Sequence, residues 1–315
     1  MRLVFCGSGE IGLPVLRSLL DAPSHKVMAV VTQPDKPAGR ELKSRASAIK
    51  TLALKRGVGV FQPDRIRTPE AVRVLRELSP DVVVVVAYGQ ILSREVLDIP
   101  RIGCLNLHAS LLPRHRGASP IQAAMLAEEK ETGITVMWMN EGLDTGDILL
   151  SETLEISQTE TAGELHNRLA EIAVPALVKA LAMIDQGNAP RIPQREDLST
   201  HAPKMSKADG VLDWLQPAAR LALRVRAMSP WPGAFTHLGG RVLKIHEAVA
   251  VEGHGKPGTF LQADAEGFVV AAGVGALALK SVQLEGRKRM DAAGFLRGFP
   301  VNRASSMDLS FSQKG

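Results

Sequence analysis

The segment 104–110 alternates polar and apolar side chains, reading Cys-Leu-Asn-Leu-His-Ala-Ser. Successive side chains of a β-strand point to opposite faces, so Asn106, His108 and Ser110 would share one face. An amide and an imidazole can both donate hydrogen bonds to a developing oxyanion, and a histidine can also move a proton near neutral pH. Because buried polar groups need partners, an ordinary buried strand rarely carries three of them. The segment therefore predicts a chemical site presented by a strand.

An aspartate that could join this site follows in residues 142–147, which read Gly-Leu-Asp-Thr-Gly-Asp. The carboxylate of Asp144, if close, would favour the protonated ring of His108 and fix its orientation. No serine or cysteine nucleophile is obviously paired with this histidine, so the set suits a direct acyl-type transfer in which the substrate supplies the nucleophile. From the spacing alone, a buried structural histidine and a turn aspartate explain the pattern equally well.

These motifs resemble those of the folate-dependent formyltransferases, and most closely those of the members that act on methionyl-tRNA. The first motif is Asn-Leu-His-Ala-Ser-Leu-Leu-Pro-Arg-x-Arg-Gly at residues 106–117, and the aspartate motif follows it in the same order. The resemblance implies that Asn106, His108 and Asp144 are the catalytic residues. One departure is His115, where relatives usually carry an aromatic residue between the two arginines.

The resemblance also implies that 10-formyltetrahydrofolate is the co-substrate. Residues 110–113 match the folate-binding stretch of the family. Residues 88–92 follow a predicted strand, at an edge where parallel sheets bind ligands. The expected folate-binding residues are therefore Ser110, Leu111, Leu112, Pro113, Tyr88, Gly89, Gln90, Ile91 and Leu92. We expect no metal, because the two cysteines and the scattered histidines lack the spacing of a zinc site.

The first part of the chain alternates strand-like and helix-like patterns. Residues 2–6 and 27–32 are predicted strands, with a helix near 13–20 between them. Residues 82–86 are an unbroken run of valine, which is typical of a parallel strand buried on both faces. Such alternation predicts a parallel sheet with right-handed crossovers. We therefore expect an α/β, Rossmann-like catalytic domain over residues 1–189.

A glycine motif at residues 7–12, Gly-Ser-Gly-Glu-Ile-Gly, fits the dinucleotide-binding fingerprint. A nicotinamide-binding fold also needs an acidic residue at the end of its second strand. Here that strand ends in Val-Thr-Gln-Pro at residues 31–34. We therefore interpret the glycines as a tight turn with close packing of helix on strand, and we disfavour a nicotinamide oxidoreductase.

The last part of the chain has a different character. Residues 190–205 are rich in turn-forming residues and are the expected linker. Short predicted strands separated by glycine-rich turns follow, which favours a small barrel over residues 206–315. The segments 229–236 and 283–290 resemble the carboxyl-terminal domain of the tRNA-formylating members. That resemblance implies a small OB-like, tRNA-binding β-barrel.

The positive charge of the chain is concentrated in this last part. The formal net charge is +5, and residues 201–315 hold 15 Lys and Arg against 9 Asp and Glu. This excess suggests a polyanionic partner. Residues 33–45, rich in proline and basic residues, predict an exposed loop and resemble the family's insertion that reaches the tRNA acceptor stem. The expected tRNA-binding residues are Lys36, Arg40 and Lys43.

Composition places the chain among soluble globular proteins, with 45% hydrophobic and 23% charged residues. No apolar run approaches the ~20 residues of a membrane span, and the first residues resemble a strand rather than a signal peptide. Two cysteines in apolar runs suggest free thiols in a reducing compartment. We therefore expect a cytoplasmic protein with no membrane partner. A monomer is expected as well, although none of these features bears on the oligomeric state.

The resemblance implies an enzyme of translation initiation that transfers the formyl group of 10-formyltetrahydrofolate to the amino group of initiator methionyl-tRNA. Three alternatives remain open. The chain could formylate a small amine such as glycinamide ribonucleotide or an amino sugar, or hydrolyse 10-formyltetrahydrofolate with water as nucleophile. A non-catalytic RNA-binding protein would explain the basic second part and would leave the Asn–His–Asp set without a purpose.

Overall fold

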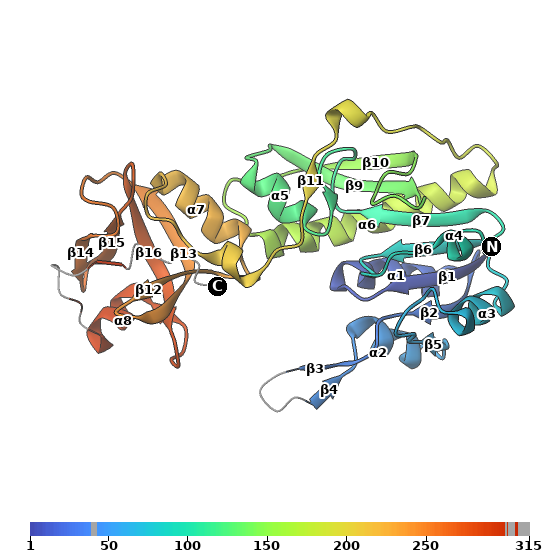
Figure 1. Ribbon diagram of the computed structural model, residues 1–315, viewed down its shortest axis with the longest axis horizontal. Helices are drawn as coiled ribbons and strands as arrows, with labels where there is room; N and C mark the ends of the chain where they lie inside the picture. The colour runs from blue at the N-terminus through green and yellow to red at the C-terminus, as the bar shows by residue number, and fades with distance from the viewer. Residues whose placement is uncertain (39–42, 300, 302–305, 308–315) are drawn as a thin grey trace. The chain divides into compact units, whose positions relative to one another are not determined.

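The computed structural model describes residues 1–315 except 39–42, 300, 302–305 and 308–315, and it divides into two compact units (Figure 1). The first unit consists of residues 1–120, 130–156 and 166–203. The second unit consists of residues 121–129, 157–165 and 204–315. In the described part of the chain, no helix is both long and apolar enough to cross a membrane.

A mixed β-sheet forms the centre of the first unit, with the strand order β10-β9-β7-β6-β1-β2-β5 among the described residues. Its strands are β1 (Arg2–Gly7), β2 (Lys26–Val31), β5 (Val60–Phe61), β6 (Val82–Val86), β7 (Gly103–His108), β9 (Glu131–Trp138) and β10 (Ile148–Glu155). From β7 to β5 every neighbouring pair is parallel, whereas β9 runs antiparallel to both β7 and β10. The valines of β6 are all buried, as a strand covered on both faces requires. The parallel strands confirm the predicted α/β class, and the antiparallel edge is an addition to it.

Helices connect these strands along the chain, and side-chain hydroxyls cap the starts of several of them. The helices are α1 (Leu13–Asp21), α2 (Ala48–Lys55), α3 (Pro69–Glu77), α4 (Arg94–Leu97), α5 (Pro120–Leu126) and α6 (Ala162–Asp185), of which α5 lies in the second unit from residue 121 onward. The hydroxyl of Thr68 accepts the backbone N–H of Ala71 and stands before a proline, which together start α3. The hydroxyl of Ser47 accepts the backbone N–H of Lys50 and starts α2.

The glycine motif at residues 7–12 forms a tight turn into the 3-10 helix η1 (Glu10–Gly12). A Cβ added at Gly7 would lie 2.9 Å from the carbonyl oxygen of Val86, so the chain needs glycine to pass so close to β6. The hydroxyl of Ser8 accepts the backbone N–H of Gln33 at 3.0 Å and ties the turn to the end of β2. The motif thus serves close packing in this structure, as predicted.

A hairpin of β3 (Lys36–Ala38) and β4 (Lys43–Arg45) follows β2. At its base, the carboxylate of Asp35 accepts hydrogen bonds from Lys50 Nζ at 2.6 Å and from Gln62 Nε2 at 2.9 Å. The segment predicted as a loop therefore has a paired backbone and an anchored base.

The residues expected to be a linker, 190–205, belong to the first unit up to residue 203. They include the 3-10 helix η2 (Glu196–Leu198) and β11 (His201–Ala202). β11 pairs in parallel with β8 (Arg116–Gly117), which lies in the motif that follows β7. Most of the stretch therefore belongs to the first unit, to which the pairing of β11 with β8 attaches it.

The second unit is built on an antiparallel sheet in the order β12-β13-β16-β15-β14, with β17 paired to β16, among the described residues. Its strands are β12 (Ala234–Leu238), β13 (Arg241–Val251), β14 (Phe260–Asp264), β15 (Gly267–Ala271), β16 (Ala276–Leu284) and β17 (Met290–Asp291). Beside α5, its helices among the described residues are η3 (Lys207–Gly210), α7 (Ala218–Ala227) and α8 (Ala292–Gly298). α7 contacts β13 and β16, and α8 contacts β14, β15 and β16. The antiparallel sheet agrees with the expectation of a β-rich second domain after the α/β domain.

Candidate active site

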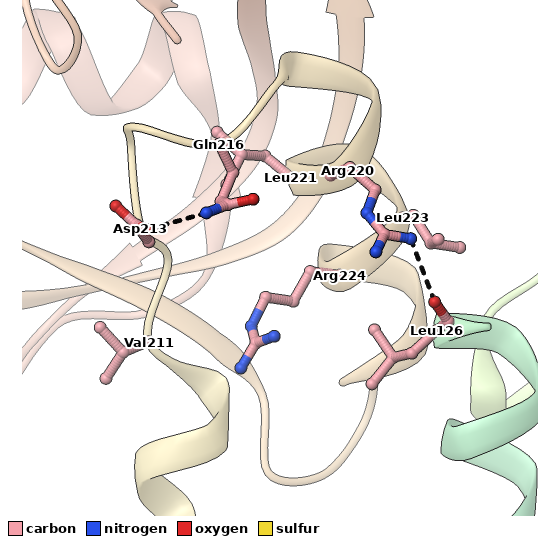
Figure 2. Close-up of a pocket in the computed structure, with 8 residues that line it drawn as sticks. All are labelled: Leu126, Val211, Asp213, Gln216, Arg220, Leu221, Leu223 and Arg224. Atoms are coloured by element: carbon pink, nitrogen blue, oxygen red, sulfur yellow. Dashed lines mark hydrogen bonds between the residues drawn. The ribbon is translucent and has the colours of Figure 1, made fainter. Parts of the chain in front are cut away.

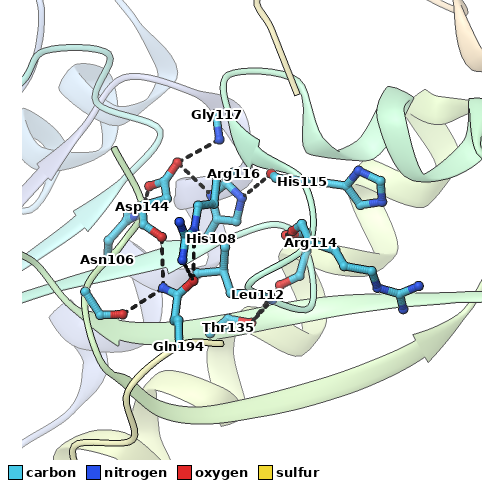
Figure 3. A network of polar contacts seen from close by, with 12 residues as sticks. Asn106, His108, Leu112, Arg114, His115, Arg116, Gly117, Thr135, Asp144 and Gln194 are labelled. Carbon is cyan, nitrogen blue, oxygen red and sulfur yellow. Dashed lines mark hydrogen bonds and ion pairs between the residues drawn. The ribbon is translucent and has the colours of Figure 1, made fainter. Parts of the chain in front are cut away.

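The structure brings Asn106, His108 and Asp144 together at the end of β7 (Figure 3). Asn106 Nδ2 donates to Asp144 Oδ1 at 3.3 Å, and His108 Nδ1 lies 3.6 Å from Asp144 Oδ2. The side chain of His108 is 6% exposed and that of Asp144 is 14% exposed. Because the pair is shielded from water, the attraction between the carboxylate and a protonated ring is stronger than at a surface.

Both ring nitrogens of His108 face oxygen atoms that only accept hydrogen bonds. Nε2 lies 2.8 Å from the carbonyl oxygen of His115, so Nε2 carries a hydrogen. Nδ1 faces the carboxylate of Asp144 at 3.6 Å, which is longer than a hydrogen bond. The Nδ1 edge is therefore the one that a substrate atom can approach, whereas the Nε2 edge is already occupied.

Asp144 lies in a turn whose backbone is held from several sides. Its φ is +52°, in the left-handed region, which asparagine and aspartate enter more readily than most residues other than glycine. The backbone N–H of Gly117 donates to Asp144 Oδ2 at 2.9 Å. The amide of Gln194 donates to the carbonyl oxygens of Asp144 at 2.8 Å and of Gly146 at 2.7 Å. These contacts fix both the carboxylate and the turn that carries it.

The loop after β7 uses its polar groups internally. The hydroxyl of Ser110 is fully buried and donates to the carbonyl oxygen of Arg114 at 2.6 Å. The hydroxyl of Thr135 on β9 donates to the carbonyl oxygen of Ser110 and accepts the backbone N–H of Leu112. Leu112 is buried, whereas Leu111 and Pro113 are partly exposed. Of the expected folate-binding stretch 110–113, only Leu111 and Pro113 present side chains to solvent.

The second expected folate-binding segment, residues 88–92, is divided between core and surface. Tyr88 is 1% exposed and Leu92 is 3% exposed, and both pack in the hydrophobic core, whereas Ile91 is 77% exposed. The Tyr88 hydroxyl has no hydrogen-bond partner among the described residues, and burial raises its pKa. Gln90 Oε1 accepts the backbone N–H of Ile66 at 2.8 Å. The side chains of Tyr88 and Leu92 therefore point into the core, whereas that of Ile91 faces solvent. The role of residues 88–92 in binding folate stays a prediction.

The sequence analysis did not identify three residues that hold the Asp144 turn in place, namely Arg116, Gln194 and Glu196. The guanidinium of Arg116, 8% exposed, donates to Gln194 Oε1 from Nε at 3.0 Å and from Nη2 at 2.8 Å. The same guanidinium makes a bidentate pair with Glu196, which lowers the pKa of that carboxyl. The available signal was the second arginine of the 106–117 motif itself, since an arginine that becomes buried needs a partner of opposite charge.

His115, the departure from the family pattern, is held through its backbone. Its N–H donates to Thr200 Oγ1 at 2.8 Å, and its carbonyl oxygen accepts from His108. Its φ of +60° lies in the left-handed region, and its side chain is 7% exposed. The position therefore contributes a carbonyl oxygen to the site whatever its side chain.

The three residues expected to bind tRNA lie in or beside the hairpin. Lys36 begins β3 and Lys43 begins β4. Arg40 lies outside the described residues. Their role in binding stays a prediction.

The second unit has a cavity of its own, of about 300 Å³ (Figure 2). Arg220 reaches across it to the carbonyl oxygen of Leu126, and it also pairs with Glu128. Arg224 donates from Nη2 to the carbonyl oxygen of Asp209. The lining residues are Leu126, Val211, Asp213, Gln216, Arg220, Leu221, Leu223 and Arg224. None of them belongs to the catalytic set or to the residues expected to bind folate.

Comparison with known proteins assigns the chain to a family. Residues 1–181 match the model of the formyl transferase family, and residues 204–300 match the model of the formyl transferase C-terminal domain. The methionyl-tRNA formyltransferase of Symbiobacterium thermophilum is 49% identical over 302 residues, which cover 95% of this chain and 92% of that protein. That of Magnetococcus marinus is 48% identical over 307 residues, covering 97% and 98%.

Among solved structures, the same fold occurs in HypX from Aquifex aeolicus in complex with tetrahydrofolic acid, with a TM-score of 0.64 and 20% identity. The match covers 98% of this chain and 50% of HypX, so the chain spans about half of that longer protein. At this identity the likeness shows the fold alone. The identity of nearly half of all residues along almost the whole chain, together with matches to both domain models, shows that the chain belongs to the family of the methionyl-tRNA formyltransferases.

Proposed function

We propose that this protein transfers the formyl group of 10-formyltetrahydrofolate to the free amino group of initiator methionyl-tRNA, which gives N-formylmethionyl-tRNA for translation initiation. The observation that carries the proposal is the assembled set of Asn106, His108 and Asp144 in a chain 43–49% identical to methionyl-tRNA formyltransferases over about 95% of its length. We further propose that the protein is a cytoplasmic monomer of 33.8 kDa, and its elution volume in size-exclusion chromatography tests the monomeric state.

In the proposed reaction the amine nitrogen attacks the formyl carbon, and negative charge develops on the formyl oxygen. Asn106 Nδ2 carries two hydrogens, and one of them is directed to Asp144, so the other can be donated to that oxygen. When the His108 ring carries a second proton, its Nδ1–H can be donated to the same oxygen, since its contact with Asp144 is long. Two such donors in a shielded site stabilise the tetrahedral intermediate.

Collapse of the intermediate breaks the bond between the formyl carbon and the folate nitrogen. One proton leaves the attacking amine and one reaches the departing nitrogen, so the proton count balances. Asp144 accepts hydrogen bonds from Asn106 and Gly117 and can take up or relay this proton at Oδ1 or Oδ2. The side chain of His108 stays fixed during the step because its Nε2 is bonded to the loop that follows β7.

The test compares three amines with 10-formyltetrahydrofolate as the donor. Charged initiator methionyl-tRNA, charged elongator methionyl-tRNA and glycinamide ribonucleotide are incubated separately, and the formylated product is quantified. We expect formylmethionine on the initiator tRNA alone. Formylation of the small amine without the tRNA, or release of formate without any acceptor, would replace the proposed substrate and keep the site chemistry.

A further inference from the structure

We propose that Gln194 is a positioning residue that holds the turn of Asp144 in its reactive geometry, and that Arg116 holds Gln194 in turn. The inference rests on the proposed function, because it requires Asp144 to act in formyl transfer. Gln194 lies outside both segments matched by the family models, which end at residue 181 and begin at residue 204. The inference therefore places one residue of the active site in the stretch between the two matched domains, residues 182–203.

The hydrogen-bonding capacity of the Gln194 side chain is fully used. Nε2 donates to the carbonyl oxygens of Asp144 at 2.8 Å and of Gly146 at 2.7 Å. Oε1 accepts from Arg116 Nε at 3.0 Å and from Arg116 Nη2 at 2.8 Å. A glutamine amide has two donor hydrogens and two acceptor sites, so every one of them is occupied. Gln194 is half-buried, whereas its neighbours 191–193 and 195–198 are exposed, so it alone in this stretch turns inward.

The turn uses this support because its backbone lies in a sparsely populated region. Asp144 has a φ of +52°, and although aspartate enters this left-handed region more often than most residues, the conformation persists only where surrounding contacts hold it. The amide of Gln194 bridges the two carbonyl groups that flank the turn and so fixes their separation. Asp144 can then keep its 3.3 Å contact with Asn106 and its 3.6 Å contact with His108. A misplacement of about 1 Å in such a site costs on the order of 100-fold in rate.

Arg116 connects this clamp to the other side of Asp144. Its guanidinium fixes Gln194 and Glu196, while the next residue, Gly117, donates its backbone N–H to Asp144 Oδ2 at 2.9 Å. The planar fork of an arginine fixes direction as well as distance. The carboxylate and the backbone of Asp144 are therefore both held from the Arg116–Gly117 strand β8, one directly and one through Gln194.

The experiment measures kcat and KM for the full-length Gln194→Glu variant with initiator methionyl-tRNA and 10-formyltetrahydrofolate. A glutamate keeps the size and the acceptor for Arg116, and it places a negative oxygen against the two carbonyl oxygens. We expect kcat to fall at least tenfold while both KM values stay within about twofold. Gln186→Glu, the same change at an exposed glutamine that bonds only to Asn188 among the described contacts, should leave kcat unchanged.

A double-mutant cycle separates positioning from a general structural role. If Gln194 acts through Asp144, Gln194→Glu should cost little further rate in an Asp144→Asn background, because coupled residues are not additive. An equal loss in both backgrounds, or wild-type kcat for Gln194→Glu, would overturn the inference. Wild-type kcat for Asp144→Asn alone would instead overturn the assignment of the catalytic residues.

A second variant covers the case in which Gln194→Glu does not fold, as judged by its melting temperature. Arg116→Lys keeps the positive charge and loses the fork that holds Gln194. We expect a fall in kcat of at least fivefold with unchanged KM values, and wild-type kcat in this folded variant would contradict the inference.

Discussion

At the scale of single residues, the three proposed catalytic side chains differ in how many of their hydrogen-bonding groups are already bonded within the protein. Asn106 uses one amide hydrogen, His108 has its Nε2 bonded to a carbonyl oxygen, and Asp144 accepts from two donors. The groups left to meet a substrate are thus the second amide hydrogen of Asn106 and the Nδ1 edge of His108. The free amide hydrogen of Asn106 gives a prediction for the replacement of this residue.

Asn106→Ala should lower kcat by about 10²- to 10³-fold, the usual cost of one lost oxyanion donor. The melting temperature should change little, because Asn106 is half-buried and makes a single 3.3 Å hydrogen bond. Single-turnover formylation with saturating substrates measures the effect. Asn167→Ala, at an exposed asparagine on α6, is the matched control, and equal rates for the two variants would remove Asn106 from the catalytic set.

At the scale of secondary-structure elements, the hairpin of β3 and β4 depends on Asp35 at its base. The hydrogen bond from Lys50, followed by that from Gln62, lowers the pKa of the Asp35 carboxyl. A carboxyl with a lowered pKa in the folded protein contributes stability above its unfolded pKa, and that contribution is lost as pH falls through the folded value. The contribution of Asp35 should therefore be present at neutral pH and disappear below about pH 4.

Asp35→Asn tests this pH dependence through melting temperatures measured at several pH values. The variant should be less stable than the parent protein at pH 7, and the difference should shrink as pH falls through the acidic range. Asp21→Asn, at an aspartate whose side chain is 54% exposed in its pair with Arg56, provides the control and should show a smaller difference. A constant difference between Asp35→Asn and the parent at all pH values would contradict the argument.

The elements also show what the sequence could predict and what it could not. The alternation in residues 104–110 predicted β7 and the shared face of Asn106 and His108, because that information is local. The valine run predicted the buried strand β6 for the same reason. The role of Gln194 could not be predicted, because its partner Arg116 lies 78 residues earlier and no periodic pattern spans that distance. The core positions of Tyr88 and Leu92 likewise depend on packing between elements.

At the scale of the whole molecule, the positive charge is concentrated in the part of the chain that matches the C-terminal domain model. Residues 201–315 carry the excess of Lys and Arg over Asp and Glu, and the hairpin adds Lys36 and Lys43 to the first unit. Binding of a polyanion through such residues releases counterions, so the affinity falls as salt concentration rises. This property gives a prediction for the proposed tRNA partner.

Replacing both Lys36 and Lys43 by alanine should raise KM for initiator methionyl-tRNA and leave kcat near that of the parent. A plot of log affinity against log salt should lose a slope of about 1 for each phosphate contact removed. Steady-state formylation measures KM and kcat, and fluorescence titration of labelled tRNA at several salt concentrations measures the slope. Lys55→Ala, at the exposed end of α2, is the control, and an unchanged slope in the double variant would place the tRNA elsewhere.

The parallel pairing of β8 with β11 has a consequence for the order in which the enzyme matures. His115 and Arg116 bind residues that lie 78 to 85 positions later in the chain. Contacts of such separation close late in folding, because the intervening chain must be ordered first. A nascent chain that has emerged only as far as α6 holds every strand of the seven-stranded sheet together with Asn106, His108 and Asp144, but it lacks β11 and the Gln194 amide that contact this site. We therefore expect the contacts around Asp144 to be completed only after the stretch that follows α6 has been synthesised.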